Sequence, residues 1–149
     1  MANWTKQRYF EDIETGEELP AVSFFLSKQR MVMAASAMRD FNLAHCSSEF
    51  AKGRGAPDMY VNNTFIMAAF YRLLSEYIGL DGKCVQIGPI RLKKFTCCGH
   101  TATYHGHVTG KRIENGRGLV ELAVSSTLED GTVTTEGTAI VALPMTERE

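Results

Sequence analysis

Residues 64–78 of the chain read TFIMAAFYRLLSEYI, and eleven of these 15 residues are hydrophobic. The four polar residues fall along one edge of a helix, which leaves the rest of its surface apolar. Asn62 or Asn63 can cap the start of this helix, and Gly79 can end it. A helix that is apolar nearly all round is buried on most sides. We therefore expect a central helix that other structure wraps.

This helix does not have the features of a membrane span. At about 1.5 Å per residue it is roughly 22 Å long, and it contains Arg72 and Glu76. The sequence holds no run of 18 apolar residues, so we exclude a transmembrane helix. The apolar segment is instead expected inside the protein.

The second half of the chain has the pattern of β-strands. The predicted strands cover residues 84–95, 101–112, 118–128 and 132–143. In the third of them, Val120, Leu122 and Val124 alternate with polar residues, as in a strand with one buried face.

The connections between these strands also favour an antiparallel sheet. Asn115-Gly116 and Asp130-Gly131 are strong signals for tight hairpin turns. Gly88-Pro89 predicts a bulge or a kink in the first of the four strands.

The first half of the chain is predicted to be mainly helical. Residues 21–26 favour a first strand, and Ser27 is a good cap for a helix over about 28–40. A loop is expected over residues 40–58, DFNLAHCSSEFAKGRGAPD. Loops of this length in a compact domain are usually functional or mobile.

Helices followed by a run of strands are typical of an α+β domain with an antiparallel sheet. The length of 149 residues fits a single domain over residues 1–149. A long central helix wrapped by a curved antiparallel sheet of about five strands is the arrangement called the hot-dog fold. Such a sheet leaves an open edge that a second copy commonly covers, so we expect a dimer.

The composition excludes two classes of partner. Lys and Arg number 16 against 17 Asp and Glu, so the formal net charge is -1. Because nucleic acids and anionic membranes both attract an excess of positive charge, we expect neither as a partner.

Residues 1–14 lack the apolar core of a signal peptide, and the four cysteines lack CxxC spacing. We therefore expect reduced thiols and a cytoplasmic location.

The loop over residues 40–58 contains the first candidate site. Asp40, Asn42 and His45 lie within six positions of one another. Imidazole is the natural base near neutral pH, and a carboxylate beside it can orient it or bind the same water molecule. The spacing fits equally well with Asp40 as a helix-terminal residue and His45 as a solvated side chain.

The start of the central helix is the second candidate site. Its free backbone N–H groups, near Asp58 to Asn63, carry a partial positive charge. Such groups can stabilise an oxygen that becomes negative in a transition state. The alternative is that Asn62 and Asn63 only cap the helix.

Other motifs give less support for function. His105 and His107 lie two positions apart on a predicted strand, so they share a face with several threonines. A zinc site would need further ligands that the pattern does not supply, so we expect no metal. The sequence contains no GxGxxG, P-loop or GxSxG motif, which leaves nucleotide binding and serine hydrolysis unsupported.

The segment RDFNLAH, residues 39–45, resembles the DxNPxH signature of the MaoC-like, (R)-specific enoyl-CoA hydratases. The likeness extends through the lead-in YFEDIETGEELP, the central helix and IRLKKF, and covers most of the chain in outline. Proteins of this family have the hot-dog fold. The Asp and His of their signature form the catalytic dyad, which corresponds here to Asp40 and His45, with Asn42 at the intervening Asn.

A closer likeness is to the small MaoC-type subunit of actinobacterial steroid side-chain enoyl-CoA hydratases, which works with a second hot-dog-containing chain. The shared residues are Arg39-Asp40-Phe41, His45, Ala51-Lys52-Gly53, Asp58 and Val61-Asn62. The sequence departs from the family at two places. Leu43 replaces the proline of the signature, and Pro57-Asp58-Met59 occupies the place where we expect the family's His-Gly pair.

The resemblance implies reversible hydration of a trans-2-enoyl-CoA to the (R)-3-hydroxyacyl-CoA. By this resemblance, Asp40 and His45 activate the water, and the helix start near Asp58 and Met59 binds the thioester oxygen. The residues expected to contact the substrate are Asn42, Asp58, Met59 and Asn62. No metal or cofactor is implied, and coenzyme A enters only as part of the substrate.

The resemblance also implies a partner chain, either a second copy in a homodimer or another MaoC-like chain in a heteromer. Two alternatives stay open at this point. One is a hot-dog acyl-CoA thioesterase, and the other is a subunit that is active only with a second MaoC-like chain.

Overall fold

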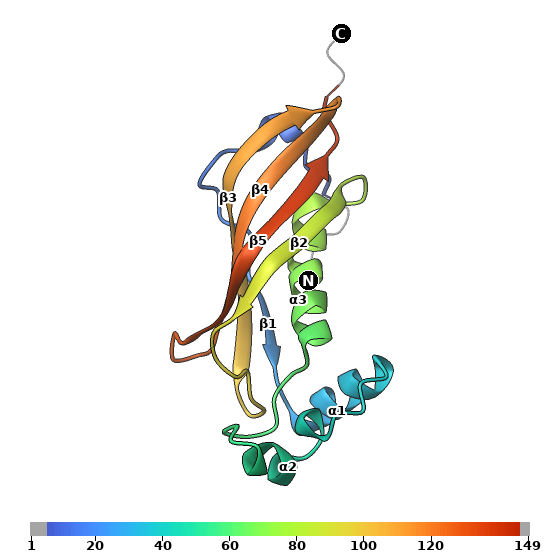
Figure 1. Ribbon diagram of the computed structural model, residues 1–149. Helices are drawn as coiled ribbons and strands as arrows, with labels where there is room; N and C mark the ends of the chain where they lie inside the picture. The colour runs from blue at the N-terminus through green and yellow to red at the C-terminus, as the bar shows by residue number, and fades with distance from the viewer. Residues whose placement is uncertain (1–5, 147–149) are drawn as a thin grey trace.

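The computed structural model describes residues 6–146, and the start of the N-terminal segment discussed above lies outside this range. The ten elements are η1 (Phe10–Asp12), β1 (Val22–Phe25), α1 (Lys28–Ala37), η2 (Leu43–His45), α2 (Ser48–Gly53), α3 (Asn63–Ile78), β2 (Lys83–Leu92), β3 (Thr101–Glu114), β4 (Arg117–Thr127) and β5 (Val133–Leu143). Helix α3 lies against one face of the sheet, and α1 and α2 group near the end at which α3 begins (Figure 1).

The five strands form one sheet in the order β1-β3-β4-β5-β2, and every neighbouring pair is antiparallel. The prediction of a long helix against a curved antiparallel sheet of five strands is therefore confirmed. Strand β1 has four residues, whereas the strand at the opposite edge, β2, has ten. The long open edge of this sheet is thus the β2 edge.

The predicted turns are found where the sequence signals place them. Asn115 and Gly116 join β3 to β4 with φ angles of 51° and 73°, as a two-residue hairpin with positive φ requires. Gly131, with φ 82°, lies in the connection between β4 and β5. The pairing of β2 with β5 shifts register between Ile87 and Ile90, on either side of Gly88-Pro89.

The hydrophobic core lies between α3 and the sheet. Val120, Leu122 and Val124 of β4 are buried at alternate positions, as the pattern predicts. Phe70 of α3 meets Tyr104 of β3 edge to face, with 5.1 Å between ring centroids. Burying a side chain such as Phe70 contributes about 1.5–3 kcal/mol, so these contacts hold the helix on the sheet.

Helix α3 begins and ends at the residues that the sequence indicates. The Asn62 side chain accepts a hydrogen bond of 2.8 Å from the Phe65 N–H and caps the helix. Gly79 follows the last helical residue with φ 76°, and a Cβ there would lie 2.8 Å from the Lys6 carbonyl oxygen. Only glycine fits that position without strain.

Helix α3 nevertheless has one exposed stripe. Ala68, Tyr71 and Arg72 are exposed, and the Tyr71 side chain is 57% accessible. Most other residues of α3 are buried or half-buried, so the helix is buried on most sides, as predicted, except along this stripe. Its exposed face therefore remains open to a partner.

The segment over residues 40–58 is more ordered than the loop that we expected. It contains η2 and the short helix α2, whose first turn is capped by the Ser47 hydroxyl accepting from the Phe50 N–H. Helix α1 is capped by Ser27, as predicted, and ends at Ala37 rather than near residue 40.

Among residues 6–146, no helix combines the length and the apolar character that crossing a membrane requires.

Candidate active site

Asp40 and His45 face each other where the chain leaves α1. Arg39 adopts a left-handed conformation with φ 55°, and the Asp40 N–H donates to the Ala35 carbonyl at 2.9 Å. This sharp turn directs the carboxylate toward η2, where His45 is the last residue. Asp40 Oδ2 lies 3.5 Å from His45 Nε2, and the two side chains are 33% and 10% exposed.

A backbone carbonyl determines which nitrogen of His45 carries the proton. His45 Nδ1 lies 2.8 Å from the Tyr60 carbonyl oxygen. Because a carbonyl can only accept a hydrogen bond, Nδ1 of the neutral ring carries the hydrogen. Nε2 therefore presents its lone pair toward Asp40, as a general base requires.

Asn62 joins the start of α3 to this pair. Its Oδ1 accepts the capping bond from Phe65, and its Nδ2 donates a 3.0 Å hydrogen bond to Asp40 Oδ2. Asn62 thus caps the helix, as the sequence predicts, and it also has a second role that the sequence did not indicate. The same carboxamide caps the helix and orients the carboxylate.

The electrostatics of the site keep Asp40 ionised. The Asn62 side-chain amide, which has the largest effect, and the Asn42 backbone N–H hold the pKa of Asp40 below its ordinary value. Asp40 Oδ2 and the Nε2 lone pair of His45 are then two acceptors 3.5 Å apart. A water molecule has two hydrogens, so one water can donate to both acceptors.

Asn42 stabilises the loop that carries the dyad. Its N–H donates to Asp40 Oδ1 at 3.2 Å, and its side-chain oxygen accepts from the Ala44 N–H at 3.0 Å as the cap of η2. The carboxamide of Asn42 is therefore engaged locally, and its predicted contact with substrate stays a prediction.

Asp58 and Met59 do not stand at the head of the helix, which corrects our expectation. Helix α3 begins at Asn63, five residues after Asp58. The Met59 N–H donates to the Asp58 carboxylate at 2.7 Å, so it is not free to bind a substrate oxygen. Ser48, the Met59 N–H and Lys52 hold the pKa of Asp58 well below its usual range.

The free N–H groups at the start of α3 belong instead to its first residues. Asn63 and Thr64 have no residue earlier in the helix to accept from their N–H groups. Asn63 also lines a pocket of about 510 Å³ that the segment over 55–61 forms with α3 and residues 92–96. Lys94 and Phe95 line the same pocket.

The comparison with known proteins rests on structure. No family model matches the sequence, and no curated protein matches it. A chain of the ChsH1-ChsH2 complex from Mycobacterium tuberculosis superposes with a TM-score of 0.78 at 24% identity, over 87% of this chain and 98% of that one.

Two further solved structures superpose on this chain about equally well. The (R)-hydratase from A. caviae involved in PHA biosynthesis has a TM-score of 0.78 at 20% identity, covering 90% of this chain and 99% of that one. The MaoC-like dehydratase from Rhodospirillum rubrum has a TM-score of 0.77 at 17% identity, covering 95% and 99%. This chain has the hot-dog fold of the MaoC-like dehydratases.

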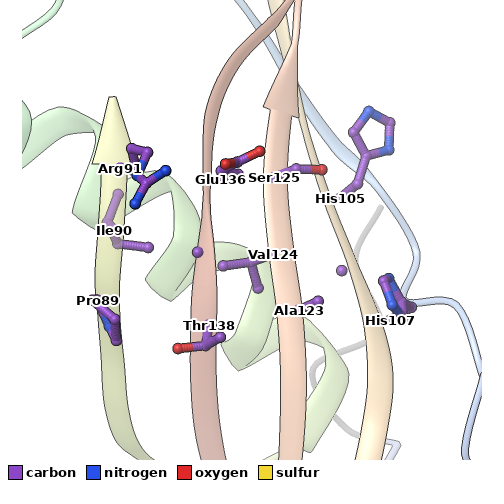
Figure 2. A pocket seen from close by; sticks show the side chains of 12 residues that line it. Pro89, Ile90, Arg91, His105, His107, Ala123, Val124, Ser125, Glu136 and Thr138 are labelled. Carbon is purple, nitrogen blue, oxygen red and sulfur yellow. The ribbon is translucent and has the colours of Figure 1, made fainter. Parts of the chain in front are cut away.

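A second pocket of this hot-dog domain, of about 610 Å³, lies on the sheet face away from α3. The strand register aligns His105, Ser125, Glu136 and Arg91 in one row across β3, β4, β5 and β2, and Figure 2 shows this row. His105 and His107 share this face, as predicted. No group of three metal-binding side chains occurs within residues 6–146.

The sequence analysis missed the contribution of the Tyr60 backbone to the candidate active site. Its carbonyl orients His45, and its N–H donates to the Ala44 carbonyl at 3.3 Å, so the two segments pair beside the dyad. A backbone carbonyl is present in every residue, so no side-chain motif could have identified it.

Proposed function

We propose that the chain hydrates trans-2-enoyl-CoA thioesters to (R)-3-hydroxyacyl-CoA thioesters, with Asp40 and His45 as the catalytic dyad. The observation that carries the proposal is the 3.5 Å approach of Asp40 Oδ2 to His45 Nε2, with the proton of the imidazole held on the opposite nitrogen. The hot-dog fold of R-hydratases and MaoC-like dehydratases supports the same class of reaction.

In the proposed reaction, a water molecule donates one hydrogen bond to Asp40 and the other to His45. His45 Nε2 accepts a proton as the water oxygen forms a bond to C3 of the enoyl group. The electrons of the C2–C3 double bond move toward the thioester oxygen, and the proton on Nε2 then passes to C2. General acid–base help of this kind contributes about 10²–10⁴-fold in rate.

The developing charge on the thioester oxygen needs hydrogen-bond donors. We assign this role to the N–H groups of Asn63 and Thr64, which stand at the positive end of the α3 dipole. Donors of this kind contribute about 10²–10³-fold each to the rate. The unsaturated thioester is already activated, so the reaction needs no cofactor or metal.

The 510 Å³ pocket suits the carrier arm of a coenzyme A thioester. The residues that line it include the aromatic residues Tyr60 and Phe95 and the basic residues Lys93 and Lys94. Lys93 forms a 2.8 Å ion pair with Glu136, so Lys94 is the better candidate to meet a phosphate of the carrier.

We also propose that the chain works with a partner along the β2 edge. An edge strand exposes unpaired backbone groups, and Val85 and Leu92 on β2 are more than half exposed. Tyr71 on the uncovered face of α3 and Leu80 after it are exposed as well. A second copy or another MaoC-like chain could cover both. Two solved structures of similar fold, the ChsH1-ChsH2 complex and the HadBC (3R-hydroxyacyl-ACP dehydratase) complex, both from Mycobacterium tuberculosis, are multi-chain complexes.

The test is a hydratase assay that follows loss of the enoyl absorbance, over substrates from crotonyl-CoA to polycyclic enoyl-CoA. Asp40→Asn and His45→Ala should each lower kcat by at least about 10²-fold without loss of the folded state. Asp81→Asn removes an exposed carboxylate elsewhere and should have no effect. Full activity in both dyad variants would refute the assignment.

Two other outcomes would identify the alternatives. Release of free thiol without loss of the double bond would indicate an acyl-CoA thioesterase. A purified chain that becomes active only after addition of a second MaoC-like protein would indicate a subunit of a heteromer.

A further inference from the structure

The Tyr60 ring lies between the dyad and the 510 Å³ pocket. On one side it meets the His45 ring edge to face, with 5.1 Å between centroids. On the other side it packs against the Phe95 ring at 4.8 Å. Phe95 lines the pocket and His45 does not, so the Tyr60 ring has the catalytic base behind it and the open pocket in front.

The space on the dyad side of this ring is narrow. His45, Asn62 and Phe65 line a crevice with no room for a water-sized sphere. The crevice and the 510 Å³ pocket have only Tyr60 and Val61 in common among their lining residues. Val61 is buried, and its N–H donates to the Thr96 carbonyl at 3.0 Å. The half-buried Tyr60 side chain is therefore the movable part of the boundary.

The Tyr60 backbone is held in place, in contrast to its ring. Its N–H donates to Ala44, its carbonyl accepts from His45, and it forms an isolated β-bridge with Cys97. A turn of the side chain about its own χ angles leaves all three contacts intact. The ring can thus move without disturbing the orientation of the catalytic base.

We propose that Tyr60 is a gating and specificity-determining residue. Its ring separates the thioester pocket from the dyad until an acyl group displaces the ring. This inference rests on the proposed function in one respect, the nature of the substrate. The ring has to leave its resting position before the C2–C3 bond of a substrate in the pocket reaches His45. The bulk of the acyl group near C3 then determines how well the displaced ring is accommodated.

The first test does not depend on hydratase activity. Diethyl pyrocarbonate acylates neutral imidazole nitrogens, and mass spectrometry of peptides gives its rate at each histidine. Tyr60→Ala and Tyr60→Leu should raise the rate at His45 on the order of tenfold, because a smaller side chain removes the need for a local opening. Tyr60→Phe keeps the ring and should leave the rate unchanged. The exposed His100 and His107 serve as internal references.

Two controls separate gating from a loosened loop. Phe95→Ala widens the pocket without removing the boundary, so His45 should react as in the parent protein. Alkylation of the buried Cys97, which pairs with the Tyr60 backbone, reports on local unfolding. An unchanged rate at His45 in both truncation variants would overturn the proposal. Equal acceleration of His45 and Cys97 in both would overturn it as well.

The second test measures specificity. In Tyr60→Ala, kcat/KM for enoyl-CoA substrates with branching near C3 should rise relative to crotonyl-CoA, whereas Phe95→Ala should leave that ratio unchanged. An unchanged ratio in Tyr60→Ala would overturn the specificity role. If His45 becomes accessible but no variant hydrates any enoyl-CoA, the gating role stands and the proposed function fails.

Discussion

Asn62 Nδ2 donates a 3.0 Å hydrogen bond to Asp40 Oδ2 across 22 positions of sequence, while the other end of the same carboxamide caps α3. The orientation of the Asp40 carboxylate is therefore coupled to the first turn of the central helix. A change at Asn62 should affect both the chemistry and the stability of the protein.

Asn62→Asp separates these two effects. Asp is as good a helix cap as Asn, but a second carboxylate beside Asp40 raises the pKa of Asp40 instead of lowering it. The proposed reaction needs an ionised Asp40 and a free Nε2 lone pair on His45, and the added carboxylate disfavours both, so the acid limb of the kcat/KM profile should move to higher pH. On that limb, kcat/KM falls about tenfold for each pH unit, so the variant should be less active than the parent protein at the same acidic pH.

Asn62→Ser is the matched control, since it keeps a capping oxygen and adds no charge. Its acid limb should move less than that of Asn62→Asp. Superimposable pH profiles for the parent protein and Asn62→Asp would contradict the coupling between Asn62 and Asp40.

Asn63→Pro tests the donors at the head of α3. Proline is favoured at the first helical position, and the preceding Asn62 already has the extended backbone that proline requires. The variant should fold, yet it lacks the Asn63 N–H. We expect a loss of about 10²–10³-fold in kcat, measured in the hydratase assay beside a thermal melt.

Asn63→Ala keeps the backbone N–H and should retain nearly all activity. If Asn63→Pro is fully active and Asn63→Ala is too, the thioester oxygen is bound elsewhere.

Asp58→Asn should affect stability and leave catalysis intact. Ser48, the Met59 N–H and Lys52 hold the pKa of Asp58 well below the ordinary value of 3.8. The ionised form therefore stabilises the folded state above about pH 4, and this contribution is lost as pH falls through the folded pKa. The variant should have a lower Tm at neutral pH and a weaker fall of Tm in acid.

The measurement is Tm against pH, with Asp81→Asn as the control for loss of an exposed carboxylate. Hydratase activity of Asp58→Asn should match the parent protein, because the Asp58 carboxylate contacts the Met59 N–H and Lys52 rather than Asp40 or His45. A large loss of activity with an unchanged Tm would return Asp58 to the substrate-binding residues.

Charges on the β2 edge should separate the proposed assembly. Val85→Lys and Leu92→Lys place a cation on the exposed edge strand, a substitution that opposes strand pairing between chains. Native mass measurement should then give the monomer. Ile113→Lys changes an equally exposed apolar residue near the end of β3 and should leave the assembly intact. An unchanged mass in both edge variants would rule out this interface.

The elements of the fold could be predicted because their signals are local. The apolar period of residues 64–78, the Ser27 and Asn62 caps and the Asn115-Gly116 turn each act over a few residues. The short helix α2 was missed, since six residues carry too little periodicity to distinguish a helix from a loop.

The approach of Asp40 to His45 was predictable for a similar reason. Asp40 and His45 are five positions apart, within the reach of one turn and one short helix. The head of the helix was misplaced among Pro57, Asp58 and Met59, because a position in a motif does not reveal where a helix begins.

Sequence pattern alone predicted the five strands, the two longer helices and their order, and it placed Asp40 and His45 close together along the chain, since backbone propensity and side-chain period are properties of neighbours along the chain. Tertiary structure alone brought the Tyr60 carbonyl to His45 over 15 positions and the Asn62 amide to Asp40 over 22. Packing of α3 on the sheet sets those distances. The tautomer of His45 and the orientation of the Asp40 carboxylate therefore depend on the folded core rather than on any local motif.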